Sequence, residues 1–228
     1  MIATLKQEAN EILAGGIKVN GQIVPPAEYR ANALEIDARG QEKKIRELIA
    51  SSNFLAALRA FAEFDRDFKG TLPHTEILPL VSQTISRYLA GVQQQLSNFD
   101  KATKERAAGL TRMQFEDRRN SEAAIAEELA LAEQQLKNER QARLGWVTIY
   151  PFLKATMDET LNFGKQELNR LNTAISRPPA DAGKAYRDAF RTISSAPDDA
   201  ARKAALAEAR TAGVSAKYFA TLEAAANR

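Results

Sequence analysis

The chain has 228 residues, of which 44% are hydrophobic and 27% charged, a composition typical of a folded protein with a core. Its 32 lysine and arginine residues nearly balance 29 aspartate and glutamate residues, so the net charge of +3 does not by itself indicate a polyanionic partner. The absence of cysteine excludes disulfides, thiol nucleophiles and thiolate metal sites, and leaves the compartment open.

Composition also bears on the fold class. The aromatic share is only 7% and alanine is abundant, which favours close-packed helices, so we expect an all-α fold. No segment reaches the roughly eighteen apolar residues that a transmembrane helix needs. Residues 1–14 alternate apolar with charged residues, unlike a signal peptide, and predict a helix at the very start. Such a start would suit a segment of a longer protein.

The next stretch predicts a small β-hairpin over residues 17–24. Two short β-prone runs flank Asn20-Gly21, a pair that favours a tight type I′ turn. Pro25 and Pro26 then predict a helix start, and that helix should turn Tyr29, Ala33 and Ile36 inward.

Two further helices are predicted before residue 70. One covers residues 41–50, and Ser51-Ser52-Asn53 offers caps for the second. The second helix carries four phenylalanines, Phe54, Phe61, Phe64 and Phe68, and Gly70 provides a stop. Their helical spacing predicts the main core anchor; a base-stacking or ligand-binding surface is the alternative.

The segment from Ser52 to Phe61, Ser-Asn-Phe-Leu-Ala-Ala-Leu-Arg-Ala-Phe, resembles the tetratricopeptide repeat, with its tight turn followed by an aromatic residue, a small alanine and a second aromatic residue. The resemblance covers about residues 41–70 and has no second copy at the family's period. It implies a helical hairpin and a possible peptide-binding role, and it transfers no ligand-contact residue, because the family's groove needs several stacked repeats.

A long amphipathic segment then runs from Pro73 to Arg143. Apolar residues recur three or four apart from Ile77 to Met113, and again from Ile125 to Leu136. The run 116–122 has no apolar residue, so either one helix continues through it or the chain bends there. The lack of Gly and Pro from Thr111 to Gln141 favours one continuous helix. Nine basic and nine acidic residues from Asp100 to Arg143 are typical of a solvated, coiled-coil-like helix.

The rest of the chain predicts a return and a terminal module. Residues 144–150 read as a turn or extended piece, and Pro151 opens an antiparallel return helix to about Ser176. After Pro178 and Pro179, three short alanine-rich helices should start near Asp181, Asp198 and Ser215. The expected domains are therefore residues 1–70, 71–177 and 178–228.

No motif for catalysis, cofactor binding or metal binding stands out, so we predict no enzyme, cofactor or metal site. His74 is the single histidine, which excludes a two-histidine metal site within one chain, and its place at a helix start predicts a surface position. Acidic residues that could support acid–base chemistry sit beside lysine and arginine at helical spacing, which favours a solvated face. They are Glu63, Asp65, Asp67, Asp158 and Glu159.

These patterns lead to three functional hypotheses. The first is a non-enzymatic scaffold or interaction protein that binds a protein, or itself, through its extended helical segment. The second is a peptide-binding adaptor, which the tetratricopeptide resemblance suggests. The third, favoured less than the first two, is nucleic-acid binding through an arginine set, with an affinity that would fall steeply with salt. That set is Arg112, Arg118, Arg119, Arg140 and Arg143.

Overall fold

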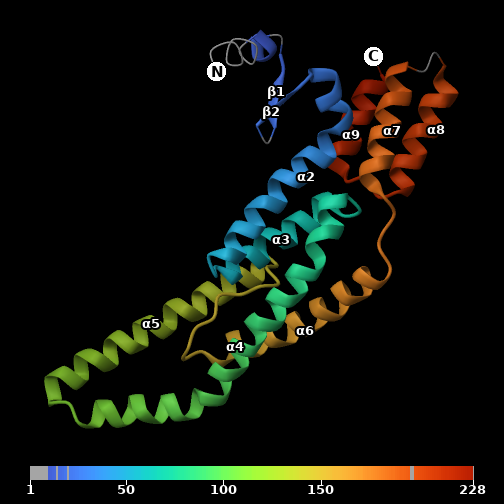
Figure 1. The fold of residues 1–228 in the computed structure, drawn as a ribbon. Helices are drawn as coiled ribbons and strands as arrows, with labels where there is room; N and C mark the ends of the chain where they lie inside the picture. The colour runs from blue at the N-terminus through green and yellow to red at the C-terminus, as the bar shows by residue number, and fades with distance from the viewer. Residues whose placement is uncertain (1–9, 14, 20, 196–197, 228) are drawn as a thin grey trace. The chain divides into compact units, whose positions relative to one another are not determined.

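The computed structural model describes residues 10–13, 15–19, 21–195 and 198–227. Two short strands and a series of helices follow one another along the chain (Figure 1), so the predicted all-α class with a small β-hairpin is confirmed. The elements are β1 (Ile17–Val19), β2 (Gln22–Val24), α2 (Pro26–Ala50), α3 (Phe54–Phe68), α4 (Leu72–Thr111), α5 (Phe115–Gln141), α6 (Lys154–Ser176), α7 (Ala182–Ser195), α8 (Asp199–Thr211) and α9 (Ala216–Ala226).

The chain divides into two compact units. The first unit consists of Met1–Glu47, Ala60–Leu78 and Ala174–Arg228, and the second of Leu48–Arg59 and Pro79–Thr173. Most of the helix predicted over residues 1–14 lies outside the described residues, of which 10–13 are helical.

The β-hairpin of the first unit is antiparallel, with Ile17 opposite Val24 and Lys18 opposite Ile23. Helix α2 follows as one helix, whereas two helices were expected on either side of Gly40. Glycine costs a helix interior about 1 kcal/mol relative to alanine. Burial of Leu34 and Ala38 before Gly40, and of Ile45 after it, offsets that cost and keeps the helix continuous.

Three of the four phenylalanines predicted to anchor the core lie in the core of the first unit, whereas the fourth, Phe54, is half-buried and belongs to the second unit. Phe61, Phe64 and Phe68 are buried, and Phe64 lies 5.3 Å from Phe68 between ring centroids. Helices α7, α8 and α9 pack on one another, and they begin one residue after the predicted starts. Asp198 caps α8, since its side chain accepts a hydrogen bond from the backbone N–H of Ala201.

A triad of hydroxyl and carboxylate groups also joins distant parts of the first unit. The hydroxyls of Tyr29 and Tyr218 both donate to the carboxylate of Asp37, at 3.1 and 2.6 Å. Burial, followed by the hydrogen bond to Asp37, raises the pKa of Tyr218, and burial raises the pKa of Tyr186 to about 12. These phenols therefore remain protonated donors at neutral pH.

The second unit contains an antiparallel helical hairpin, which consists of α4 from Pro79 onward and of the whole of α5. Helix α4 ends at Thr111 and α5 begins at Phe115, so the expected continuous helix through residues 116–122 is wrong. The chain reverses at residues 112–114, just before the polar run (Figure 1), and that run is helical. Two acidic residues, Glu116 and Asp117, occupy the first turn of α5, where the helix dipole favours negative charge.

The return helix α6 runs antiparallel beside the first part of α4, as expected, although it starts at Lys154 rather than at Pro151. Ser82 donates a hydrogen bond to Asn172 at 3.0 Å, and Leu89 lies against Gly164. A Cβ atom at Gly164 would approach the Leu89 side chain to 2.5 Å, so glycine permits this close approach of the two helices.

Candidate functional site

The outer half of the α4–α5 hairpin is unusually open. No described residue from 93 to 111 of α4 is buried, and neither is any residue from 112 to 131. The buried residues of α5, which are Ala132, Leu136 and Glu139, all follow this stretch. We call residues 93–131 the distal hairpin.

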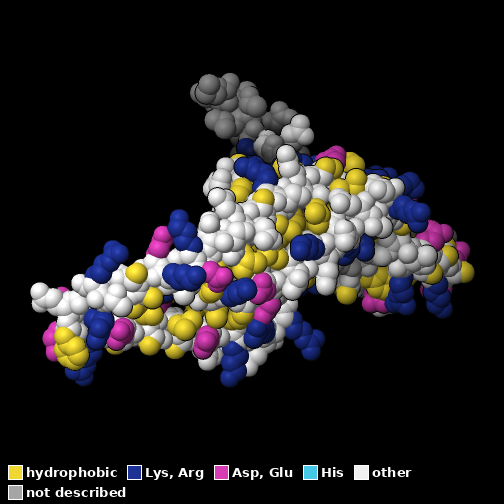
Figure 2. Space-filling view, turned by 90° about the horizontal axis from the view of Figure 1, so that it is seen from below, with side chains coloured by type: hydrophobic (Ala, Val, Ile, Leu, Met, Phe, Trp, Pro, Cys, Tyr) yellow, Lys and Arg dark blue, Asp and Glu magenta, His cyan; other side chains and the backbone are white. Residues whose placement is uncertain are grey.

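Large apolar side chains are nevertheless present on the distal hairpin. Phe115 and Leu131 are 67% and 65% exposed, Met113 is 45% exposed and Leu129 is 36% exposed. Figure 2 shows hydrophobic side chains at the end of the hairpin, at the left of the view, and along its length between charged groups. Single exposed apolar residues are ordinary, but a cluster on one segment without buried neighbours marks a surface for interaction.

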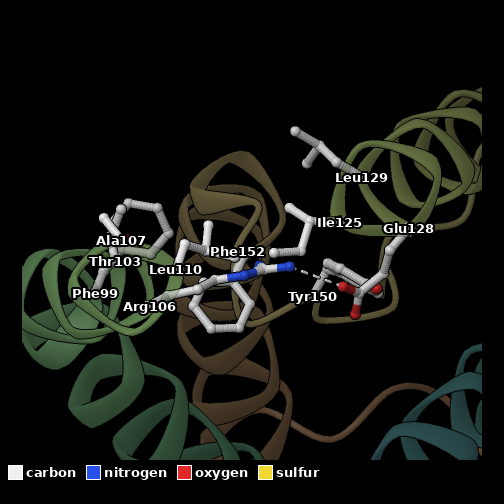
Figure 3. A pocket seen from close by; sticks show the side chains of 10 residues that line it. All are labelled: Phe99, Thr103, Arg106, Ala107, Leu110, Ile125, Glu128, Leu129, Tyr150 and Phe152. Carbon is white, nitrogen blue, oxygen red and sulfur yellow. Dashed lines mark hydrogen bonds and ion pairs between the residues drawn. The ribbon is translucent and has the colours of Figure 1, made fainter. Parts of the chain in front are cut away.

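A hollow opens between the two helices of the distal hairpin, and we call it the hairpin groove (Figure 3). Its volume is about 250 Å³, and most of its lining is apolar. Both helices and the segment that precedes α6 contribute side chains to it. The lining residues are Phe99, Thr103, Arg106, Ala107, Leu110, Ile125, Glu128, Leu129, Tyr150 and Phe152.

One polar bridge crosses this groove. The Arg106 guanidinium of α4 lies 3.0 Å from the Glu128 carboxylate of α5 and 4.1 Å from the centroid of the Phe152 ring. The two charged side chains point toward one another in Figure 3. A hydrogen bond from the Tyr150 hydroxyl, followed by the contact with Arg106, lowers the pKa of Glu128. The bridge therefore remains charged at neutral pH and gives the apolar groove one fixed polar feature.

A second hollow of about 430 Å³ lies beside the groove and shares Glu128 and Tyr150 with it. Leu131 and Ala132 supply its apolar wall, and Gln135 and Thr148 its polar wall.

The segment that places Tyr150 and Phe152 is anchored by a buried carboxylate. Glu139 is 3% exposed and accepts hydrogen bonds from the backbone N–H and hydroxyl of Thr148, at 2.8 and 2.7 Å. The Arg59 guanidinium and the Gln135 amide donate to it at 2.8 and 2.9 Å. Burial opposes ionisation, but the hydrogen bonds, led by those from Thr148, outweigh it and hold the pKa of Glu139 at about 2.

Trp146 completes the anchor. Its backbone carbonyl accepts a hydrogen bond from Arg59 at 2.9 Å, and its ring meets Phe163 edge-on at 5.0 Å and Tyr88 at 6.1 Å between centroids. Buried edge-to-face aromatic pairs contribute about 0.5 to 1.5 kcal/mol beyond their burial. Residues 144–153 are thereby held against the helices without regular secondary structure of their own.

The predicted surface position of His74 is wrong. His74 is 1% exposed, its Nε2 lies 2.8 Å from Asp65, and its ring stacks on Phe61 and Phe64. Its spacing from Ile77 and Leu78, three and four residues later, places it on the buried face of α4. This spacing in the sequence could have predicted that His74 is buried. His74 is thus part of the core of the first unit.

The other acidic candidates do not converge on one centre. Asp67 pairs with Arg66, and Glu159 pairs with Arg140, while Glu63 is exposed. Over the described ranges, no group of three or more histidine, cysteine or acidic residues is placed to hold a metal ion. No helix in the described part of the chain is both long and apolar enough to cross a bilayer.

The arginine set suggested for nucleic-acid binding is spread along the chain from the hairpin turn to the end of α5. Arg118 lies 3.7 Å from Glu122, and Arg140 is paired with Glu159. These two arginines are 22 residues apart, which corresponds to about 33 Å of helix. The set therefore does not form a single cluster.

Sequence reasoning missed the groove itself, because Tyr150 and Phe152 lie 44 and 46 residues after Arg106 of α4 in sequence. Comparison of the chain with family models, with curated proteins and with solved structures finds no match.

Proposed function

We propose that this chain is a non-enzymatic helical interaction protein and that another polypeptide binds the distal hairpin. One observation carries the proposal: residues 93–131 have no buried residue, yet they present Met113, Phe115, Leu129 and Leu131 to solvent. Full burial of one such side chain contributes about 1.5 to 3 kcal/mol. Burial of several of them against a partner supplies enough free energy for association.

The shape of the hairpin groove suits a protein partner. A hollow between two helices accepts apolar side chains that recur along one face of a partner helix, which is a common mode of recognition. The pair of Arg106 and Glu128 offers the partner one donor group and one acceptor group within the apolar lining. Such fixed polar groups set orientation and register more than affinity.

The proposal predicts the effect of a charge at the groove. Leu129→Glu places a carboxylate where the partner's apolar side chains would lie, and an unpaired buried charge is costly. We expect the tagged variant of this chain to recover its partner from a lysate of the source organism at least about tenfold less well than the unchanged chain, a loss of about 1.4 kcal/mol.

Ala130→Glu is the matched control, because it adds the same charge to the neighbouring exposed position of α5, outside the groove lining. Circular dichroism should show equal helix content in both variants. If Leu129→Glu recovers the same proteins in the same amounts as the unchanged protein and as Ala130→Glu, the hairpin groove is not the binding surface.

A further inference from the structure

Charge is distributed unevenly between the two helices of the distal hairpin. Within the distal hairpin, residues 93–111 of α4 carry three basic and two acidic side chains, whereas residues 115–131 of α5 carry two basic and five acidic ones. In these ranges the basic residues of α4 are Lys101, Lys104 and Arg106, and the acidic residues of α5 are Glu116, Asp117, Glu122, Glu127 and Glu128. The α4 part of the hairpin therefore has a net charge of +1 and the α5 part a net charge of −3.

Some of these charges border the groove. Lys104 lies three residues before Ala107 on α4, and Glu122 lies three residues before Ile125 on α5. Residues three or four apart share a helix face, so Lys104 and Glu122 flank the apolar lining on opposite helices. Lys104 and Glu122 are exposed. Lys104 has no ion-pair partner among the described residues, while Glu122 has only the 3.7 Å pair with Arg118.

We propose that the partner on the distal hairpin is a second copy of this chain, packed face to face with both hairpin turns at the same end. This inference rests on the proposed function and names its partner. In this arrangement α4 of each copy lies on α5 of the other, so each negative α5 faces an α4 with a small positive net charge and not a second negative α5. Apolar side chains of the two grooves meet between them, and the two copies form a four-helix assembly.

Symmetry leaves two ways to place the copies face to face. A two-fold axis along the hairpin sets α4 on α5 of the partner, with the turns together. A two-fold axis across the hairpin sets α4 on α4 and α5 on α5, with the turns apart, and so opposes the glutamates of the two α5 helices. Like charges placed opposite one another disfavour an interface, so the charge pattern selects the first arrangement.

The turn supports the same choice. Phe115 is 67% exposed and begins α5 directly after the turn, and Met113 within the turn is 45% exposed. With the turns together, these apolar side chains of the two copies lie near one another and cover each other. With the turns apart, the same side chains stay in water.

The absence of native cysteine makes this arrangement directly testable, because one introduced thiol is then the only one in each copy. Gln114→Cys places it in the turn, where the Gln114 side chain makes no capping hydrogen bond, and Thr103→Cys places it on the α4 side of the groove. A disulfide needs Cα atoms within about 7 Å. Formation of the disulfide therefore reports that the substituted residue lies close to the same residue of the second copy.

We expect purified Gln114→Cys to form a disulfide-linked dimer at least about tenfold faster than Thr103→Cys under mild oxidation, because association raises the local thiol concentration only at the turn. Adding Leu129→Glu to Gln114→Cys should remove that advantage. Faster linkage through Thr103→Cys would overturn the arrangement with the turns together. Slow linkage in both variants, with a monomeric mass at high concentration, would overturn the second copy as partner.

If the thiol experiment rules out a second copy as the partner, the proposed function is still tested by comparing Leu129→Glu with Ala130→Glu in the lysate. The two ideas can thus fail separately, because the thiol experiment uses only the purified chain.

Discussion

Glu139→Ala is expected to destabilise the second unit by about 1 to 3 kcal/mol, because it removes a buried acceptor and leaves the half-buried Arg59 guanidinium and the donors of Thr148 without it. The fluorescence of Trp146, the single tryptophan, should report this loss directly in urea unfolding, since Arg59 also binds the Trp146 carbonyl. Glu133→Ala, at an exposed position of the same helix, should change the unfolding free energy by less than about 0.5 kcal/mol. If Glu139→Ala has the same free energy of unfolding in urea as the unchanged protein, Glu139 does not hold residues 144–153 in place.

The same carboxylate predicts a dependence of stability on pH. Its pKa is about 2 in the folded chain against an ordinary value of 4.5, so its stabilisation is present in full above about pH 5 and is lost as the pH falls toward 2. The shift corresponds to about 3 kcal/mol. Glu139→Gln should remove this part of the acid sensitivity, and an unchanged pH profile would show that other groups cause it.

Phe64→Ala is expected to destabilise the first unit by about 3 to 5 kcal/mol, because Phe64 is 2% exposed and the truncation leaves a cavity among Phe61, Phe68 and His74. Thermal unfolding followed by far-ultraviolet circular dichroism would measure this loss.

Phe115→Ala is the matched control for Phe64→Ala, since it makes the same change at a side chain that is 67% exposed. At low protein concentration it should alter the unfolding free energy by less than about 0.5 kcal/mol. It should instead weaken association. Equal destabilisation by both variants would mean that Phe115 is already buried in the single chain.

Much of the fold follows from local signals in the sequence. Caps and breaks placed the starts of α7, α8 and α9 within one residue, and the spacing of Phe61, Phe64 and Phe68 identified a core face. These signals act between residues within a few positions of one another, which is the range that helical periodicity and capping describe.

The errors have physical causes as well. Gly40 lies inside α2, because packing on both sides outweighs its low helix propensity. The turn at residues 112–114 contains neither glycine nor proline, but Gly109 just before it and two acidic residues just after it were signals of a helix end and a helix start. Folding back there lets the apolar side chains of α4 and α5 face each other across the groove.

The groove and its anchor lay beyond prediction from one sequence. Glu139 binds Arg59, which is 80 residues away in the chain, and Phe152 meets Arg106 across 46 residues. Nothing in the local pattern of either segment specifies those pairs, because long-range contacts depend on how the helices pack. The tetratricopeptide resemblance over residues 41–70 and a peptide-binding role remain predictions.

The claim that a polypeptide binds the distal hairpin is tested most directly by a photoreactive amino acid placed at position 129 of the full chain in living cells, with position 130 as the control. We expect a covalent adduct with a second polypeptide from position 129, either another copy or a different protein, and less from position 130, which lies outside the groove lining. No adduct from position 129 would contradict the claim.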